Sequence, residues 1–330
     1  ARVAAIVGLM GAAPTVASVE GRGGVWARYE SDFRTFADRH WAASGADWSV
    51  GNYYDRAMIY YVWFARTGNA TYLDRANQMA VNYRRNYLEA NAYGASPHWL
   101  QIDGVALHHL VTGDPASLTA VGRTADHFSS AAFLASLGGP NFADNRIQAR
   151  TLTALLDAWK LRAPSTLGTD WAAKLRQALP IILATQSSDG AYRERSSQCG
   201  FNKPFMVGML NDALIRYHDT FERDPRILPA VRRAVDYMWA RNWIPSAQAF
   251  QYLEGTCTTQ WGSGDPSPAP DLNHMIVSGF GWVGRQTGDA SYFTRGDAVF
   301  AGGVTGAWLA GQKQFNQQYT SSFRYLANRY

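Results

Sequence analysis

The chain has 330 residues, of which 47% are hydrophobic and 17% are charged, and its formal net charge is +5. This composition excludes a disordered or collagen-like chain and provides for a large buried core. The sequence has no run of about eighteen apolar residues, so a membrane-spanning protein is not expected. The basic residues are dispersed along the chain and are not grouped as in nucleic-acid-binding proteins, so a dispersed anionic ligand fits the charge better.

The first 24 residues are interpreted in two ways. Arg2 is followed by a run of small and apolar residues that resembles the end of a secretory signal, with small residues at Ala13 and Ala17 before a possible cleavage site. A packed N-terminal arm explains the same residues equally well. We expect residues 1–24 to be one or the other, and we expect an extracytoplasmic protein, secreted or periplasmic.

A short turn motif repeats along the chain, in residues 65–76, 110–118 and 285–293. Each copy has a glycine suited to the left-handed position that ends a helix, followed by Asn or Asp, which caps the next helix. The pairs are Gly68-Asn69, Gly113-Asp114 and Gly288-Asp289. Weaker copies lie at 163–170 and 217–226. The motif predicts helical hairpins.

Apolar residues recur at helical spacing on both sides of these turns. The pattern predicts twelve helices, at residues 25–43, 52–67, 72–88, 100–112, 116–134, 146–162, 170–185, 204–220, 226–242, 272–287, 291–310 and 313–330. One helix of each pair is apolar all round, as in residues 58–65 and 275–282, and its partner is amphipathic. A helix that is apolar on every face is expected to be buried on every face.

Six apolar helices inside six amphipathic ones resemble the (α/α)6 toroid of carbohydrate-active enzymes. The resemblance covers residues 25–330, which we expect to form a single all-α catalytic domain with an apolar inner ring and an amphipathic outer ring. An open α-solenoid is the alternative, but its inner helices usually keep a polar face. No specific family of these enzymes is identified.

The tight turns close one end of such a ring, so the long connections lie at the other end, where the inner helices begin. Long loops on a rigid scaffold commonly carry function. The predicted cleft floor comprises Tyr53, Tyr54, Asp55, Arg56, His98, Trp99, Gln101, Asp103, Asn145, Arg146, Arg150, Asn202, Lys203, Asn211, Asp212, Asp271, Asn273, His274, Lys313, Gln314 and Asn316. The loops add Trp48, Tyr192, Arg193, Glu194, Arg195, Tyr252, Glu254, Gln260 and Trp261.

Aromatic rings beside polar groups suit a sugar chain, because its ring faces stack and its hydroxyls form hydrogen bonds. Several cations in the same predicted cleft indicate a carboxylate or sulfate on that sugar. The predicted substrate is therefore an anionic, uronate-containing polysaccharide. Its expected binding residues are Tyr54, Asp55, Arg56, His98, Trp99, Gln101, Asn145, Arg146, Arg193, Lys203 and Trp261.

The first candidate chemistry is β-elimination, which needs a group that neutralises the uronate carboxylate, a base for the C5 proton and an acid for the leaving oxygen. His274 is the predicted base and Asn273 the neutralising group, with Tyr192 or Tyr252 as proton donor. Adjacent Asn and His with a separate Tyr are similar to the arrangement in toroidal polysaccharide lyases such as the alginate lyases. An ordinary structural histidine at a helix start is the alternative for His274.

The second candidate chemistry is hydrolysis with two carboxyl groups. The candidates are Asp55, Asp103, Glu194, Glu254 and Asp271. Glu254 is the preferred general acid, because Tyr252 and Trp261 would desolvate it and raise its pKa. Asp55 and Asp103 also fit as first-turn residues that the helix dipole stabilises. We expect a polysaccharide lyase, with a glycoside hydrolase as the alternative and a non-catalytic glycan-binding or structural toroid as a further one.

The two cysteines, Cys199 and Cys257, lie in polar stretches and are candidates for one disulfide or for two free thiols. Two thiols cannot make a four-ligand zinc site, and no dinucleotide-binding glycine pattern follows a strand. We therefore expect no metal and no cofactor. The oligomeric state is left open.

Overall fold

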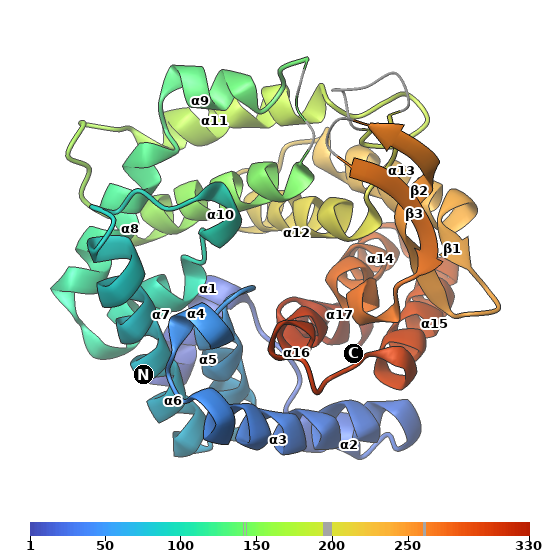
Figure 1. Cartoon of the computed structure of the whole chain (residues 1–330), viewed down its shortest axis with the longest axis horizontal. Helices are drawn as coiled ribbons and strands as arrows, with labels where there is room; N and C mark the ends of the chain where they lie inside the picture. The colour runs from blue at the N-terminus through green and yellow to red at the C-terminus, as the bar shows by residue number, and fades with distance from the viewer. Residues whose placement is uncertain (141, 143, 194–199, 260–261) are drawn as a thin grey trace.

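A computed structural model of the chain describes residues 1–140, 142, 144–193, 200–259 and 262–330. Its helices form two concentric rings (Figure 1). The inner ring in the described part of the chain consists of α5 (Arg56–Thr67), α7 (Asp103–Thr112), α10 (Asn145–Leu161), α12 (Pro204–Thr220), α14 (Asn273–Thr287) and α17 (Ser322–Arg329). The outer ring consists of α3 (Gly24–Ser44), α6 (Ala70–Tyr83), α8 (Pro115–His127), α11 (Trp171–Leu183), α13 (Ile227–Arg241) and α15 (Ala290–Gly306). The predicted (α/α)6 toroid is confirmed.

The repeated turns join inner to outer helices as the sequence predicts. Gly68, Gly113 and Gly288 are left-handed, with φ of 73°, 78° and 72°. The side chains that follow them cap the outer helices: Asn69 accepts from Thr71 N, Asp114 from Ala116 N and Asp289 from Ser291 N. One motif therefore sets the same hairpin geometry at three places around the ring.

The ring is closed by contacts between its first and last helices. The hydroxyls of Tyr29 in α3 and Ser322 in α17 are 2.6 Å apart. Tyr319 donates to the Tyr29 carbonyl at 2.9 Å, and Arg56 Nε donates to Asn316 Oδ1 at 2.8 Å. Tyr319 and Asn316 belong to α16 (Gln312–Tyr319), which precedes α17 after a short break. These contacts distinguish the toroid from an open solenoid.

Residues 1–24 pack against the ring. Helix α1 (Arg2–Met10) contacts α5 and α7, and buries Ile6, Leu9 and Met10. After α2 (Val16–Glu20), the chain enters α3. Arg66 of α5 donates from Nε to the Pro14 carbonyl at 2.8 Å, and its other nitrogens pair with Glu30 of α3. Both partners of that ion pair are buried, so the pair holds the Arg66 side chain in the position from which it binds the segment at Pro14.

The connections at the other end contain further structure. They hold α4 (Trp48–Gly51), a π-helix at Arg84–Glu89, a 3-10 turn at Pro97–Trp99, α9 (Ala131–Ser136) and a 3-10 turn at Pro270–Leu272. Residues 243–271, predicted as a loop, form an antiparallel sheet of order β1-β2-β3: β1 (Trp243–Ile244), β2 (Ala249–Thr259) and β3 (Gly262–Pro268). No helix in the described residues is long and apolar enough to cross a membrane.

Candidate active site

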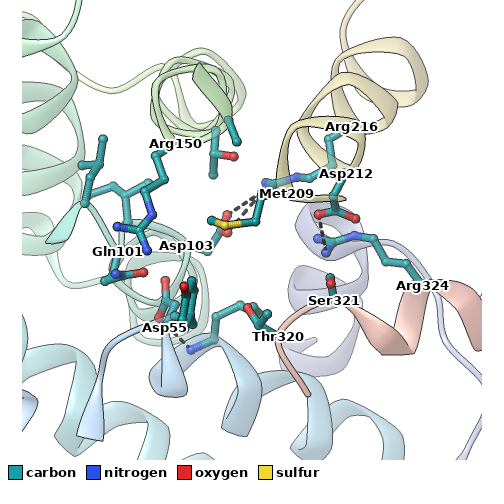
Figure 2. A pocket seen from close by; sticks show the side chains of 16 residues that line it. Asp55, Gln101, Asp103, Arg150, Met209, Asp212, Arg216, Thr320, Ser321 and Arg324 are labelled. Atoms are coloured by element: carbon teal, nitrogen blue, oxygen red, sulfur yellow. Dashed lines mark hydrogen bonds and ion pairs between the residues drawn. The ribbon is translucent and has the colours of Figure 1, made fainter. Parts of the chain in front are cut away.

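A cavity of about 80 Å³ with both polar and apolar walls, which we call the central well, lies between the inner helices. It is lined by Tyr54, Asp55, Met58, Leu100, Gln101, Ile102, Asp103, Ala149, Arg150, Thr153, Met209, Asp212, Arg216, Thr320, Ser321 and Arg324. Figure 2 shows acidic and basic side chains from several helices converging on it. A water molecule needs about 10–15 Å³ of such space, so the well holds a few waters or one small polar group.

The wall of the well at the start of α5 has an unusual backbone. Tyr54 and Asp55 have φ of 70° and 62°, a left-handed conformation that costs non-glycine residues about 1–3 kcal/mol each. The conformation turns both side chains into the well. Asp55 also caps α5, because its Oδ1 accepts from Met58 N at 3.1 Å. Two consecutive strained residues at a cavity indicate a functional site.

The second acidic side chain of the well, Asp103, begins α7 next to Asp55. Asp55 Oδ2 accepts from Gly104 N at 2.9 Å. A Cβ at Gly104 would come within 2.5 Å of Asp55 Oδ1 and 2.6 Å of Ala57 Cβ, so only glycine allows α7 to approach α5 this closely. Gly104 thereby brings the carboxyl groups of Asp55 and Asp103 into one site.

The environment of Asp55 favours its protonated form at neutral pH. Burial raises the pKa of this carboxyl to about 7, and the negative charge of Asp103 adds to the rise. The two backbone N–H groups and Arg150 oppose it but do not cancel it. A carboxyl that keeps its proton near pH 7 is suited to general acid catalysis.

The carboxylate of Asp103 is held by an ion network below the well. Arg216 of α12 binds both oxygens of Asp103 through Nη1, at 2.9 and 3.1 Å, and binds Asp157 Oδ1 of α10 through Nη2 at 3.0 Å. Burial, with the charge of Asp103, raises the pKa of the fully buried Asp157. Arg324 binds Asp212 Oδ2 at 3.1 Å beside this network. Arg216 therefore fixes the carboxylate of Asp103 beside Asp55 and links it to Asp157.

Arg150 differs from the other arginines of the well, because no described carboxylate pairs with it. It is 5% exposed, its Nη2 has no hydrogen-bond partner among the described residues, and its Nη1 reaches only the Pro97 carbonyl at 3.4 Å. Its guanidinium lies 5.1 and 5.5 Å from the ring centroids of Tyr53 and Tyr54, and the buried Tyr54 hydroxyl has no described partner either. In Figure 2, Arg150 reaches from α10 toward Gln101. A buried, unpaired guanidinium in a cavity is suited to bind an anion.

A second, larger cavity of about 800 Å³ lies beside the well, and we call it the side cavity. The two are separated by an apolar cluster that includes Tyr54, Phe205, Met206, Leu272 and Met275. The side cavity is mostly apolar, with charged groups among its lining residues: His98, Ser136, Gly139, Pro140, Phe142, Asp144, Arg146, Ile147, Phe201, Lys203, Met206, Tyr252 and Leu253. Arg146 is neutralised there by Asp144, with Nη2 and Oδ2 2.7 Å apart.

Several of the predicted catalytic and substrate-binding residues divide between these two cavities. Tyr54, Asp55, Gln101 and Asp103 line the well, whereas His98, Arg146, Lys203 and Tyr252 line the side cavity. Trp99 packs edge-on against Tyr53, with ring centroids 4.8 Å apart. The predicted position of the cleft floor, at the starts of the inner helices, thus agrees with the cavities.

The structure places His274 and Asn273 in the core rather than in the well. His274 is fully buried, with Nε2 2.9 Å from the Phe300 carbonyl and Nδ1 3.1 Å from the Gln318 carbonyl. Asn273 donates to the carbonyls of Gln248 and Val299. Neither side chain lines either cavity, because outer helix α15 packs over the start of α14. The expectation that this pair faces the substrate is corrected.

We expect replacement of His274 by glutamine to change stability and not turnover. Burial lowers the pKa of His274 to about 4, whereas the unfolded residue has a pKa near 6.5. The unfolded state therefore binds the proton more readily, so the free energy of unfolding is highest above pH 6.5 and falls as the pH drops toward 4. In chemical unfolding measured across this range, the variant should show a shallower fall than the wild type. If the folded variant instead lost kcat by a hundredfold or more, His274 would be a catalytic base.

Other predicted residues have structural partners outside the cavities. Tyr192 is buried, and Asn145 Nδ2 donates to Gln148 Oε1. The guanidinium of Arg56 binds Gln312 and Asn316 across the ring closure. Arg193 pairs with Asp189 at 2.6 Å, and Glu254 accepts from the Tyr237 hydroxyl at 2.7 Å. These placements correct the expectation that the five side chains, Glu254 as general acid included, face the substrate.

Five predicted residues, Glu194, Arg195, Cys199, Gln260 and Trp261, lie outside the described residues. Cys257, in β2, is disulfide-bonded. Among the described residues, no group of three His, Cys, Asp or Glu side chains is arranged to hold a metal ion.

The sequence analysis missed Arg216, Arg324 and Asp157. Arg216 and Asp157 lie more than three turns from the starts of α12 and α10, where candidates were sought. Arg324 stands in the first turn of α17, but the predicted helix began at residue 313 and placed it well inside. Their signal was a charge within an otherwise apolar helix, as in residues 213–217 and 154–158. Such a charge is buried by the ring and has to find a partner across it.

Comparison with known proteins supports the fold. No protein-family model matches the chain, and no curated protein matches its sequence. The structure is similar to the crystal structure of an unsaturated glucuronyl hydrolase specific for heparin. The TM-score is 0.59, the match covers 84% of this chain and 85% of that chain, and 11% of the residues are identical. At this identity the likeness establishes a shared toroid fold.

Proposed function

We propose that this protein is a glycoside hydrolase that cleaves an anionic, uronate-containing glycan. The observation that carries the proposal is the composition of the central well. It combines a buried carboxyl with a pKa of about 7, a second carboxyl group beside it that Arg216 holds, and a buried arginine with no described carboxylate partner. The toroid shared with a glucuronyl hydrolase supports the same class of substrate.

Each of the three side chains has a role in this proposal. Arg150 binds the carboxylate of the uronate and places the sugar in the well. Asp55 donates its proton to the glycosidic oxygen as the bond from that oxygen to the sugar breaks. Water adds to the sugar, and its proton passes to the carboxylate of Asp103, which acts as the base. Asp55 is then deprotonated and Asp103 protonated, and transfer of that proton to Asp55, directly or through solvent, restores the site.

Hydrolysis is preferred to β-elimination because the groups for elimination do not meet in the well. The predicted base and neutralising group, His274 and Asn273, are hydrogen-bonded within the core. Tyr252 lines the side cavity, on the other side of the apolar cluster. The well also contains a carboxyl group with a raised pKa, which hydrolysis uses directly.

The test is incubation with saturated and unsaturated uronides and with neutral oligosaccharides, while reducing ends and ultraviolet absorbance are followed together. Hydrolysis of a saturated uronide releases reducing ends with no rise in absorbance, because no double bond forms. Absorbance that rises with the reducing ends would establish elimination and overturn the proposal. Turnover confined to neutral sugars would contradict the role of Arg150.

A further inference from the structure

We infer that the site binds two anionic groups of its substrate, one at Arg150 within the well and a second, a sulfate ester or a carboxylate, at Lys313 on the rim. This inference rests on the proposed function and specifies the class of substrate further: a uronide with an additional negative charge outside the well. The residues that carry it are the two cations and the tyrosine pair between them.

Lys313 stands in the first turn of α16, in contact with the same tyrosines as Arg150. Its Nζ is 5.4 Å from the ring centroid of Tyr53 and 5.9 Å from that of Tyr54. Unlike Arg150, it is exposed and does not line the well. The two cations thus approach one aromatic pair from different compartments, Arg150 from inside the well and Lys313 from the rim.

The positive charge at this place is not neutralised by the described residues. No ion pair forms between Lys313 or Arg150 and a described carboxylate, whereas Arg146 is paired with Asp144 and Arg216 with Asp103. Partial burial lowers the pKa of Lys313, and the charges of Arg146 and Arg150 lower it further. Cations that repel one another without a counter-ion favour the binding of anions between or beside them.

The small volume of the well leaves no room within it for a second charged group of the substrate. About 80 Å³ holds the carboxylate end of a sugar but not a second charged substituent. The rest of the substrate must lie above the well, against Tyr53 and Trp99, whose rings meet edge to face 4.8 Å apart. A sugar stacked on these rings presents its substituents to Lys313.

The experiment compares two uronide oligosaccharides that differ only by a sulfate on the sugar next to the uronate, and a third that carries a carboxylate there. We measure kcat/KM for the wild type, Lys313→Gln, Lys313→Arg and a control, Lys174→Gln, which alters a half-buried lysine on outer helix α11, away from both cavities. The wild type should prefer the doubly charged substrates about tenfold, the size expected of one hydrogen bond between charged groups. Lys313→Gln should lose that preference, Lys313→Arg should keep it, and the control should match the wild type.

The outcomes separate the inference from the proposed function. If Lys313→Gln loses kcat/KM equally on singly and doubly charged substrates, both cations bind one anion and the inference is wrong. It is also wrong if the wild type has no preference. Should none of the substrates be turned over, the proposed function fails, and calorimetric affinities of the same oligosaccharides for wild type and Lys313→Gln decide the inference by the same comparison. The sulfate and carboxylate arms identify which anion the rim accepts.

Discussion

Replacement of Asp55 by asparagine is expected to lower kcat about a thousandfold, because the amide cannot donate an acidic proton to the leaving oxygen. The substrate should still bind, since Arg150 and the tyrosines remain. For the wild type, the active form is the protonated one, so kcat should be constant below the Asp55 pKa of about 7 and fall about tenfold per pH unit above it. Initial rates between pH 5 and 9 measure both effects.

The control for Asp55→Asn separates chemistry from helix capping. Asp55 accepts backbone N–H groups with both oxygens, and asparagine has only one acceptor, so some stability is lost. Asp289→Asn makes the same change at a cap of outer helix α15 that contacts neither cavity. It should leave kcat within about twofold of the wild type. If Asp55→Asn remains folded in thermal unfolding and keeps most of its kcat, Asp55 is not the general acid.

Replacement of Asp103 by asparagine is expected to lower kcat by a hundredfold or more and to change the pH profile of what remains. The asparagine oxygen still accepts from Arg216, but the negative charge beside Asp55 is gone. That charge raises the pKa of Asp55, so its removal lowers this pKa and moves the alkaline fall in activity to lower pH. A pH profile of kcat for the variant measures the shift directly.

Asp157→Asn is the matched control for this prediction. Asp157 binds the same arginine as Asp103 but is fully buried and does not line the well. Burial raises the pKa of Asp157 and so favours its uncharged form, which asparagine resembles. The fall in kcat at alkaline pH should therefore coincide for Asp157→Asn and the wild type. A shift of equal size in both variants would mean that the ion network as a whole, and not Asp103, sets the pKa of Asp55.

The ring could be predicted from the sequence because the features that determine it lie in short segments of the chain. A glycine and a capping Asn or Asp, repeated at Gly68-Asn69 and Gly288-Asp289, determine each tight turn without reference to the rest of the chain. Helices apolar on every face indicate the inner ring. The β-hairpin was missed because β3 is rich in Gly and Pro and has no strand pattern of its own. It pairs because β2 is held beside it, and Gly264 meets the Gly255 carbonyl too closely for any Cβ.

The candidate site could be located but not resolved from the sequence. Position at the start of an inner helix placed Asp55 and Asp103 correctly and His274 incorrectly, because the difference lies in what packs above each helix. A Cβ at Gly303 of α15 would come within 2.3 Å of the His274 ring, so the outer helix covers this histidine tightly. Such an approach between distant segments leaves no mark in the residues around His274. The partners of Arg216 lie on α7 and α10. They are brought to it by the closure of the ring, so the sequence of α12 alone does not predict them.

The closure of the ring also bears on how the protein folds. The bond between Tyr29 and Ser322 joins residues 293 positions apart, so it forms only after nearly the whole chain is in place. Contacts of such long range slow folding and are made late. Until then, the faces of α3 and α17 that meet at the closure stay open to solvent. Whereas a solenoid can fray repeat by repeat from a free end, this ring has no free end, and loss of the closing contact exposes the core on both sides of the gap.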